Sequence, residues 1–379
     1  MAQEFIPVGA PVLAGNEKSY VLDCLDSTWI SSRGSYIQRF ETAFADFCDA
    51  KYAQSCSNGT TALHLALLAL GIGPGDEVIV PTLTFVATAN AVNYCGGTPV
   101  FIDSEPRTWN MNPSLIEAKI TPRTRAIIVV HLYGHPVDMD AIQDIARRHG
   151  LFLIEDAAEA HGARYKGKVV GSMGDISTFS FFGNKVLSTG EGGMVVTNDR
   201  ELSRKVHLFK EQGMDPDRRY WHPVVGYNYR MTNIVAAIGL AQVEKADWHI
   251  QRRLEIAGRY RERLEGVAGL RTQVIEDWAF HVHQFFTVVL ENELDVTRED
   301  VIADLARCGI EGRPVVFPTH LLPPYAHQAS KGQYPVAELI ASRGINLPTW
   351  AGLSGNDVDY ICDAFLPAIS EPSRKRIAV

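Results

Sequence analysis

A single lysine stands out in the stretch "FSFFGNKVLSTGEGGMVVT", residues 179–197. Lys185 lies there among aromatic residues and glycines, with no acidic residue after it until Glu191. Burial lowers the pKa of a lysine, and the neutral amine can then attack a carbonyl carbon to form a Schiff base. The alternative is a solvent-exposed loop lysine, which is the commoner case for any one lysine.

A second candidate is the segment "CSNGTTAL", where Ser57, Asn58, Gly59 and Thr60 lead directly into an expected helix. The unpaired amides and the positive end of the helix dipole at such a position can bind a phosphate. Ser and Asn before a helix are more often simple N-caps, and this alternative stays open.

The third candidate is "LFLIEDAAEAHGA", in which Glu155, Asp156 and Glu159 follow an apolar strand. An acid at this end of a strand can hold a positive charge deep in a cleft. In the alternative interpretation one acid caps the next helix and the others are solvated.

Together the three segments supply a phosphate cradle, a carboxylate and an amine in chain order. Pyridoxal phosphate requires this set, because its phosphate must be held, its ring nitrogen kept protonated and its aldehyde linked to a lysine. The conjunction therefore predicts a pyridoxal phosphate site.

The elements that must position these residues are those of an α/β protein. Between about residues 57 and 198, near-continuous apolar runs alternate with helical patterns, which indicates a mostly parallel central sheet covered by helices on both faces. Gly71 and Gly150 follow two of these helical patterns at the position of a left-handed helix end. Ligands of such sheets bind at the carboxyl ends of the strands.

The chain length of 379 residues predicts two domains. We expect a large cofactor-binding domain over residues 1–245 and a smaller C-terminal α/β domain over residues 246–379. After Thr232, a plausible N-cap, a long helical pattern of one or two helices leads into the second domain.

The segments "SNGTTAL", "EDAAEAHGA", "FSFFGNK", "TGEGG" and "GYNYRMTN" resemble the DegT/StrS-type nucleotide-sugar aminotransferases, and the similarity covers nearly the whole chain. This resemblance implies the aspartate-aminotransferase fold, which is fold type I of the pyridoxal phosphate enzymes. It also implies that Lys185 forms the Schiff base and that Asp156 pairs with the pyridine nitrogen. Glu159 takes the position that contacts the ring hydroxyl, where many members have Gln.

The same resemblance assigns Gly59, Thr60 and Ser180 to the cofactor phosphate and Phe85 to stacking on the ring. Asn228 corresponds to a phosphate contact that reaches across from the other subunit. The resemblance therefore implies a homodimer with two shared active sites.

Three segments, "TWISSRG", "FFGNK" and "EQGMDPDRRYWHPVVGYNYRMTN", most resemble the members that aminate C4 of GDP-4-keto-6-deoxy-D-mannose, with L-glutamate as the donor. A sugar linked to UDP or dTDP, or an inactive regulatory homologue, is the alternative. The candidate substrate contacts are Trp29, Ser31, Arg219, Arg230 and His320. Arg219 and His320 could equally belong to a dimer interface.

The composition and the residue patterns argue against several other classes of function. A net charge of −8 with dispersed basic residues argues against nucleic acid as a partner. The apolar runs are too short to cross a membrane, and six unclustered cysteines without a signal-peptide pattern predict a cytoplasmic protein with free thiols. His281 and His283 alternate on an expected strand without a third ligand, so no metal site is expected.

Overall fold

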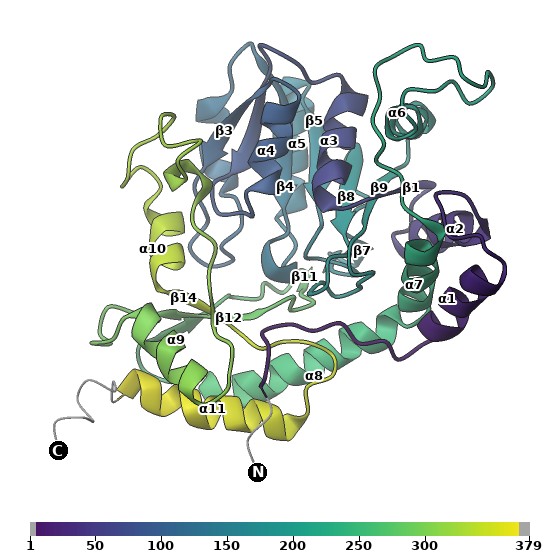
Figure 1. The fold of residues 1–379 in the computed structure, drawn as a ribbon. Coiled ribbons are helices and arrows are strands. Elements are labelled where there is room, and N and C mark those ends of the chain that lie inside the picture. The colour runs from purple at the N-terminus through teal and green to yellow at the C-terminus, as the bar shows by residue number, and fades with distance from the viewer. Residues whose placement is uncertain (1–4, 371–379) are drawn as a thin grey trace.

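A computed structural model describes residues 5–370 of the chain. Its centre is a seven-stranded sheet in the order β1-β9-β8-β5-β4-β2-β3 (Figure 1). The strands are β1 (Tyr52–Cys56), β2 (Glu77–Pro81), β3 (Thr98–Ile102), β4 (Thr124–Val130), β5 (Phe152–Asp156), β8 (Ile176–Ser180) and β9 (Gly193–Thr197). Only β9 runs antiparallel to its neighbours β1 and β8. The mostly parallel sheet predicted from the sequence is confirmed.

Helices cover both faces of this sheet, as its strands require. The strand residues are apolar on both sides, so alternate residues enter different cores. Val78 and Ile128 pack with α3 (Gly59–Leu70), α4 (Ala87–Tyr94) and α6 (Arg200–Lys210). Ile79 and Ile127 pack instead with α5 (Met139–His149). A third core joins β8 and β9 to α2 (Ser35–Phe47) and α7 (Asn233–Glu244).

The two predicted glycine helix ends are also confirmed. Helix α3 ends before Gly71 at φ 80°, and α5 ends before Gly150 at φ 62°. These left-handed conformations favour glycine because it has no Cβ atom.

The long pattern after Thr232 forms two helices, α7 and α8 (Ala246–Leu264), which meet at Lys245. Thr232 occupies the N-cap position, but its side chain makes no capping hydrogen bond. Helix α8 packs with α9 (Arg298–Arg307) and α11 (Gly355–Ser370) on an antiparallel sheet of order β10-β12-β14-β13. Its strands are β10 (Leu270–Thr272), β12 (Phe286–Leu290), β13 (Arg313–Pro314) and β14 (Gly344–Leu347).

Two segments cross the boundary expected at residue 245. Near the beginning of the chain, Ile6 forms a β-bridge with Ile310 beside the smaller sheet. In the other direction, Tyr325 and α10 (Pro335–Arg343) pack into the core of the large sheet. The two units therefore share contacts around the edge where the large sheet's strands end.

The remaining elements are short or lie at the periphery. They are α1 (Glu17–Asp26), the 3₁₀ turns η1 (Pro113–Leu115), η2 (Glu117–Lys119), η3 (Leu132–Gly134) and η4 (Thr319–Leu321), and a small sheet of β6 (Arg164–Tyr165), β7 (Lys168–Val169) and β11 (Ala279–Phe280). All six cysteines are free thiols, as predicted. Over residues 5–370, every helix is too short or too polar to cross a bilayer.

Candidate active site

A cavity of about 480 Å³ opens where the parallel strands of the large sheet end. Both units of the fold line it, because β13 and β14 contribute residues opposite those of the large sheet. Seven of the eight cofactor residues predicted from the sequence meet there: Gly59, Thr60, Phe85, Asp156, Glu159, Ser180 and Lys185.

The start of α3 has the geometry for both of the functions that the sequence left open, a helix cap and a phosphate site. Asn58 caps the helix, since its side chain accepts a hydrogen bond from the Thr61 amide at 2.9 Å, and Thr61 accepts one from the Asn58 amide. The amides of Gly59 and Thr60 have no acceptor among residues 5–370, and both residues line the cavity. A Cβ atom on Gly59 would lie 2.7 Å from the Ser180 Cβ, so glycine is required for this close approach. The result is an anion cradle of two amides and the Ser180 hydroxyl.

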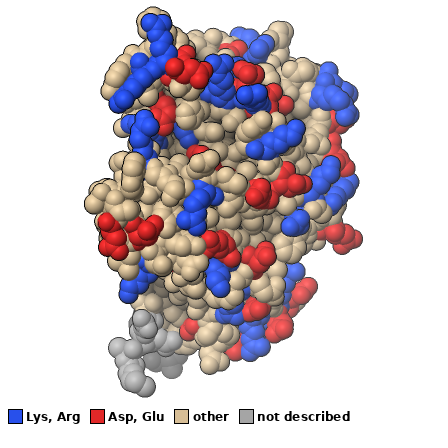
Figure 2. All heavy atoms as spheres, turned by 90° about the vertical axis from the view of Figure 1, so that its right-hand side faces the viewer, with Lys and Arg blue, Asp and Glu red and all other residues tan. Residues whose placement is uncertain are grey.

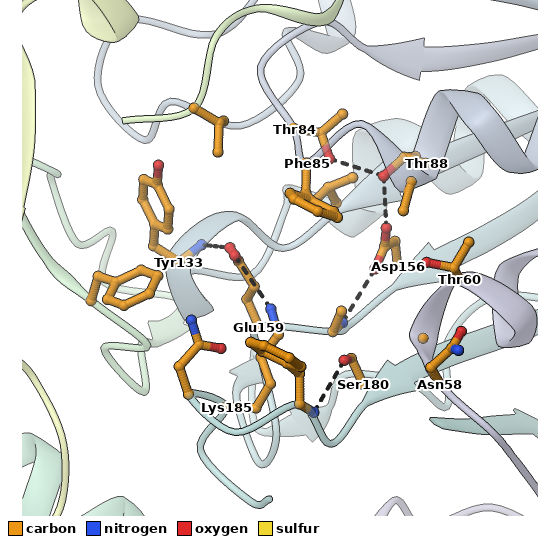
Figure 3. A pocket seen from close by; sticks show the side chains of 18 of the residues that line it. Asn58, Thr60, Thr84, Phe85, Thr88, Tyr133, Asp156, Glu159, Ser180 and Lys185 are labelled. Atoms are coloured by element: carbon orange, nitrogen blue, oxygen red, sulfur yellow. Dashed lines mark hydrogen bonds and ion pairs between the residues drawn. The ribbon is translucent and has the colours of Figure 1, made fainter. Parts of the chain in front are cut away.

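Asp156 is buried at the end of β5 and is held by hydrogen bonds (Figure 3). Thr88 Oγ1 donates to its carboxylate at 2.8 Å, and Thr84 Oγ1 lies 2.9 Å from Thr88 Oγ1. The amide of Ala158 donates to the same carboxylate at 3.3 Å. Burial nevertheless raises the pKa of Asp156, because the charged form loses its hydration. A cationic group bound beside it would stabilise the ionised carboxylate.

Glu155 has a different role from its neighbour. The two side chains leave the strand on opposite faces, and Glu155 binds His131 Nε2 at 3.1 Å. The amides of Gly171, Met173 and Gly174 also donate to it at 2.6–2.8 Å. The alternative of a helix cap beside solvated acids is therefore wrong for Glu155 and Asp156, because both are buried. The alternation of side chains along a strand could have predicted that Glu155 and Asp156 lie on opposite faces of the sheet. No sequence signal identified the partners of Glu155.

Lys185 is not a solvent-exposed loop lysine. Its side chain is 14% exposed, and its Nζ lies 3.6 Å from Glu159 Oε1. The other oxygen of Glu159 accepts a hydrogen bond from the Tyr133 amide at 2.8 Å. The fold thus places Glu159 beside Lys185, although the first acidic residue after Lys185 in the sequence is Glu191. Figure 3 shows both side chains pointing into the cavity below Phe85.

Several residues around the cavity were not predicted. Thr84 and Thr88 are four positions apart in "TLTFVAT", the first before α4 and the second in its first turn, and this spacing is a signal that could have identified them. The others come from turns or from the second unit and carry no comparable signal. They include Tyr133, Phe182, Asn184, Phe285, Arg313 and Asn346.

None of the five residues expected to contact the substrate lines this cavity. Trp29, Ser31 and Arg219 are exposed and do not line the cavity. Arg230 pairs with Glu211 at 3.5 Å and also donates to Asn228, the eighth predicted cofactor residue, which is exposed.

His320 is placed differently from the others, because it is fully buried. One ring nitrogen lies 2.6 Å from Thr82 Oγ1 and the other lies 3.2 Å from Glu338 Oε1. Its ring nitrogens are therefore engaged within the protein, and the structure does not support a direct substrate contact.

The chemistry of the cavity fits pyridoxal phosphate. The Gly59–Ser180 cradle suits a phosphate, and the buried Asp156 suits a protonated ring nitrogen. Lys185 supplies the amine, and the exposed ring of Phe85 offers an apolar face at the same cavity. These groups are placed as the three sequence segments predicted.

Comparison with known proteins gives a consistent result. The model of the DegT/DnrJ/EryC1/StrS aminotransferase family matches residues 11–366. A GDP-perosamine synthase of Caulobacter vibrioides is 56% identical over 360 residues, which are 95% of this chain and 97% of that protein. A GDP-perosamine synthase of Escherichia coli O157:H7 is 54% identical over 95% of this chain and 98% of its own length.

Among solved structures, S. venezuelae DesV in complex with a ketimine intermediate superposes with a TM-score of 0.89 at 37% identity. The match covers 94% of this chain and 95% of DesV. The fold is therefore that of the type I pyridoxal phosphate enzymes. The chain belongs to the DegT/DnrJ/EryC1/StrS aminotransferase family, and its cofactor is pyridoxal phosphate.

Proposed function

We propose that this protein transfers the amino group of L-glutamate to C4 of GDP-4-keto-6-deoxy-D-mannose, giving GDP-perosamine and 2-oxoglutarate. The observation that carries the proposal is the single cavity in which Lys185, Asp156 and the Gly59–Ser180 cradle meet. The substrate identity rests on the similarity to the two GDP-perosamine synthases, which extends over nearly the whole chain.

The roles of the residues follow from their chemistry. When bound, pyridoxal phosphate supplies an electron sink for negative charge that develops on carbon. Asp156 would hold the proton on its ring nitrogen, and the amides of Gly59 and Thr60 with Ser180 would bind its phosphate. Lys185 is the one amine that lines the cavity among the described residues. It would first hold the cofactor and then, as the free amine, move a proton between the reacting carbons.

The two alternatives differ in what they predict for the site. An aminotransferase for a UDP- or dTDP-linked sugar would use the same cofactor residues and differ only in its substrate loops. An inactive regulatory homologue would be free to lose Lys185 or Asp156, whereas both are present beside an open cradle. The complete set favours an active enzyme.

A substrate panel tests the proposal. Purified protein with L-glutamate should convert GDP-4-keto-6-deoxy-D-mannose to a product whose mass matches the GDP-amino sugar. We expect kcat/KM for this sugar to exceed that for UDP- and dTDP-linked 4-keto-6-deoxy sugars by about 100-fold or more, because a site that hydrogen-bonds one base leaves its polar groups unpaired when a different base binds. Turnover of a non-GDP sugar alone would contradict the assignment and leave the aminotransferase reaction in place.

A second part of the proposal is that the active form is a homodimer with shared sites. Large apolar side chains are exposed on α1 and after it, namely Leu22, Leu25, Trp29 and Ile30, and in the loop after α6, namely Tyr220, Trp221 and Val225. Figure 1 places α1 and this loop on the same side of the molecule, and Figure 2 shows uncharged surface between the charged groups on that side. Exposed apolar surface of this kind is typical of protein interfaces.

Mixing two inactive variants tests the shared site. If Asn228 serves the partner's cofactor, a dimer of one Lys185→Ala chain and one Asn228→Asp chain has one intact site. Statistical mixing should then restore about a quarter of the wild-type activity per chain, because half of the dimers are mixed and each has one of two sites. The measurement is activity after co-expression of the two chains, with each variant alone as the control. No recovery above the Asn228→Asp protein would show that Asn228 does not act across an interface.

A further inference from the structure

The backbone of the Lys185 turn is held by side chains from distant parts of the chain. Gln284 Nε2 donates to the carbonyl of Asn184 at 2.6 Å, and an Arg253 guanidinium nitrogen donates to the carbonyl of Lys185 at 3.4 Å. Arg253 lies on α8, and Gln284 lies two residues before the start of β12. The turn that carries the reactive amine is therefore attached to the second unit of the fold.

Arg253 is an unusual residue because it is buried and binds carbonyl oxygens. It is 2% exposed and donates to the carbonyls of Thr349 at 2.7 Å, Gln284 at 3.0 Å and His283 at 3.4 Å. Burial lowers the pKa of Arg253 to about 9, so the guanidinium is still charged at neutral pH. One side chain thus joins two loops, at residues 283–284 and at Thr349, to the carbonyl of Lys185.

The same group of residues also reaches the other end of Lys185. The amide of Gln284 donates to the carbonyl of Tyr133 at 2.8 Å. The amide of Tyr133 donates to Glu159, whose second oxygen lies 3.6 Å from Lys185 Nζ (Figure 3). Contacts therefore run from the backbone of the lysine turn through Gln284, Tyr133 and Glu159 and return to the lysine amine.

Tyr133, in this ring of contacts, and His283, next to Gln284, have a backbone conformation that residues with a side chain rarely adopt. Tyr133 has φ 55° and His283 has φ 49°. Such conformations persist only where the surroundings hold them, and they concentrate at functional sites. The left-handed Tyr133 is held on both sides, because its amide donates to Glu159 and its carbonyl accepts a hydrogen bond from the amide of Gln284.

We infer that Arg253 and Gln284 are positioning residues that fix both the backbone and the amine of Lys185 and couple them to α8. Neither residue lines the cavity. The inference rests on the proposed function only in taking Lys185 as the reacting amine. It predicts that loss of either residue slows the chemical step and leaves substrate binding unchanged.

The test compares Gln284→Met with Tyr260→Phe. Gln284→Met keeps the side-chain volume and removes the donor to Asn184, together with an Oε1 atom that is buried without a partner among the described residues. Tyr260→Phe is the matched control, because Tyr260 is also on α8 and its buried hydroxyl donates to the carbonyl of Pro348 at 2.9 Å. Both variants lose one hydrogen bond to a loop carbonyl, but only the first touches the lysine turn.

We expect Gln284→Met to lower kcat by about 10- to 100-fold with KM for the nucleotide sugar unchanged, since small misplacement of a reacting group has effects of this size. Tyr260→Phe should keep kcat within about 2-fold of wild type. Arg253→Lys, which keeps the charge but not the planar fork, should fall between them.

Hydrogen exchange gives a readout that needs neither substrate nor cofactor. In the cofactor-free protein, Gln284→Met should speed amide exchange over residues 183–187, whereas Tyr260→Phe should not. Unchanged exchange in that segment, or equal losses of kcat in both variants, would overturn the inference. A failure of the GDP-sugar assignment leaves the exchange result as it is, so the two proposals are tested separately.

Discussion

Replacing Lys185 with alanine is expected to lower kcat by on the order of 10⁴-fold or more, because one side chain serves as the covalent anchor of the cofactor and as the proton carrier. No other amine lines the cavity in the described part of the chain to replace it. The covalent link itself can be located by borohydride reduction of the wild-type protein followed by peptide mapping. The label should be found on Lys185, and the alanine variant should take up none.

The matched control for this prediction is Lys210→Met. Lys210 is the less exposed of the two lysines, and its Nζ binds Glu41 and the carbonyl of Ser55, each at 3.0 Å. Its loss should lower the melting temperature and leave the reduced cofactor on Lys185. A label on any other residue, or turnover by Lys185→Ala above one hundredth of wild type, would refute the assignment of Lys185.

The sequence allowed the main parts of the site to be predicted because each part is local. A helix start, a strand end and a loop lysine each carry their signal within a few residues, and a parallel sheet brings strand ends to one edge. The two helix ends at Gly71 and Gly150 were predictable for the same reason, since a left-handed closing residue follows from its own helix.

The parts that were missed depend on contacts between distant residues. Lys185 and Glu159 are 26 positions apart, and only the pairing of β5 with β8 brings their segments together. His320 stands in a proline-rich loop whose sequence suggests exposure, but its imidazole is buried by partners 238 and 18 positions away. The left-handed Tyr133 has no local signal at all, because glycine or asparagine would be expected there.

Asp156→Asn and Glu155→Gln should have opposite consequences, although the residues are adjacent. Asparagine retains the shape of Asp156 and cannot hold the ring proton by charge, so we expect kcat to fall by on the order of 10²- to 10³-fold. Cofactor binding should change far less, because the phosphate cradle is intact.

Glu155→Gln leaves His131 and several amides with a neutral partner. This change should lower the free energy of unfolding by about 3–5 kcal/mol and leave kcat unchanged in the protein that remains folded.

The pH dependence of stability separates the same two residues in the cofactor-free protein. Burial opposes the charge of Glu155, but the hydrogen bonds from His131 and the backbone amides outweigh it and lower its pKa. Its contribution to stability is therefore complete above the unfolded pKa near 4.5 and is lost as the pH falls through the folded value.

Asp156 has the opposite sign, because burial raises its pKa in the folded state. Its contribution is present below the unfolded pKa near 3.8 and is lost as the pH rises through the folded value, so burial of this carboxyl group destabilises the cofactor-free protein at neutral pH. Thermal unfolding at pH 7 should accordingly find Asp156→Asn at least as stable as wild type and Glu155→Gln much less stable. A large loss of stability in Asp156→Asn would mean that this carboxylate supports the fold, and the contrast that assigns it to the cofactor would fail.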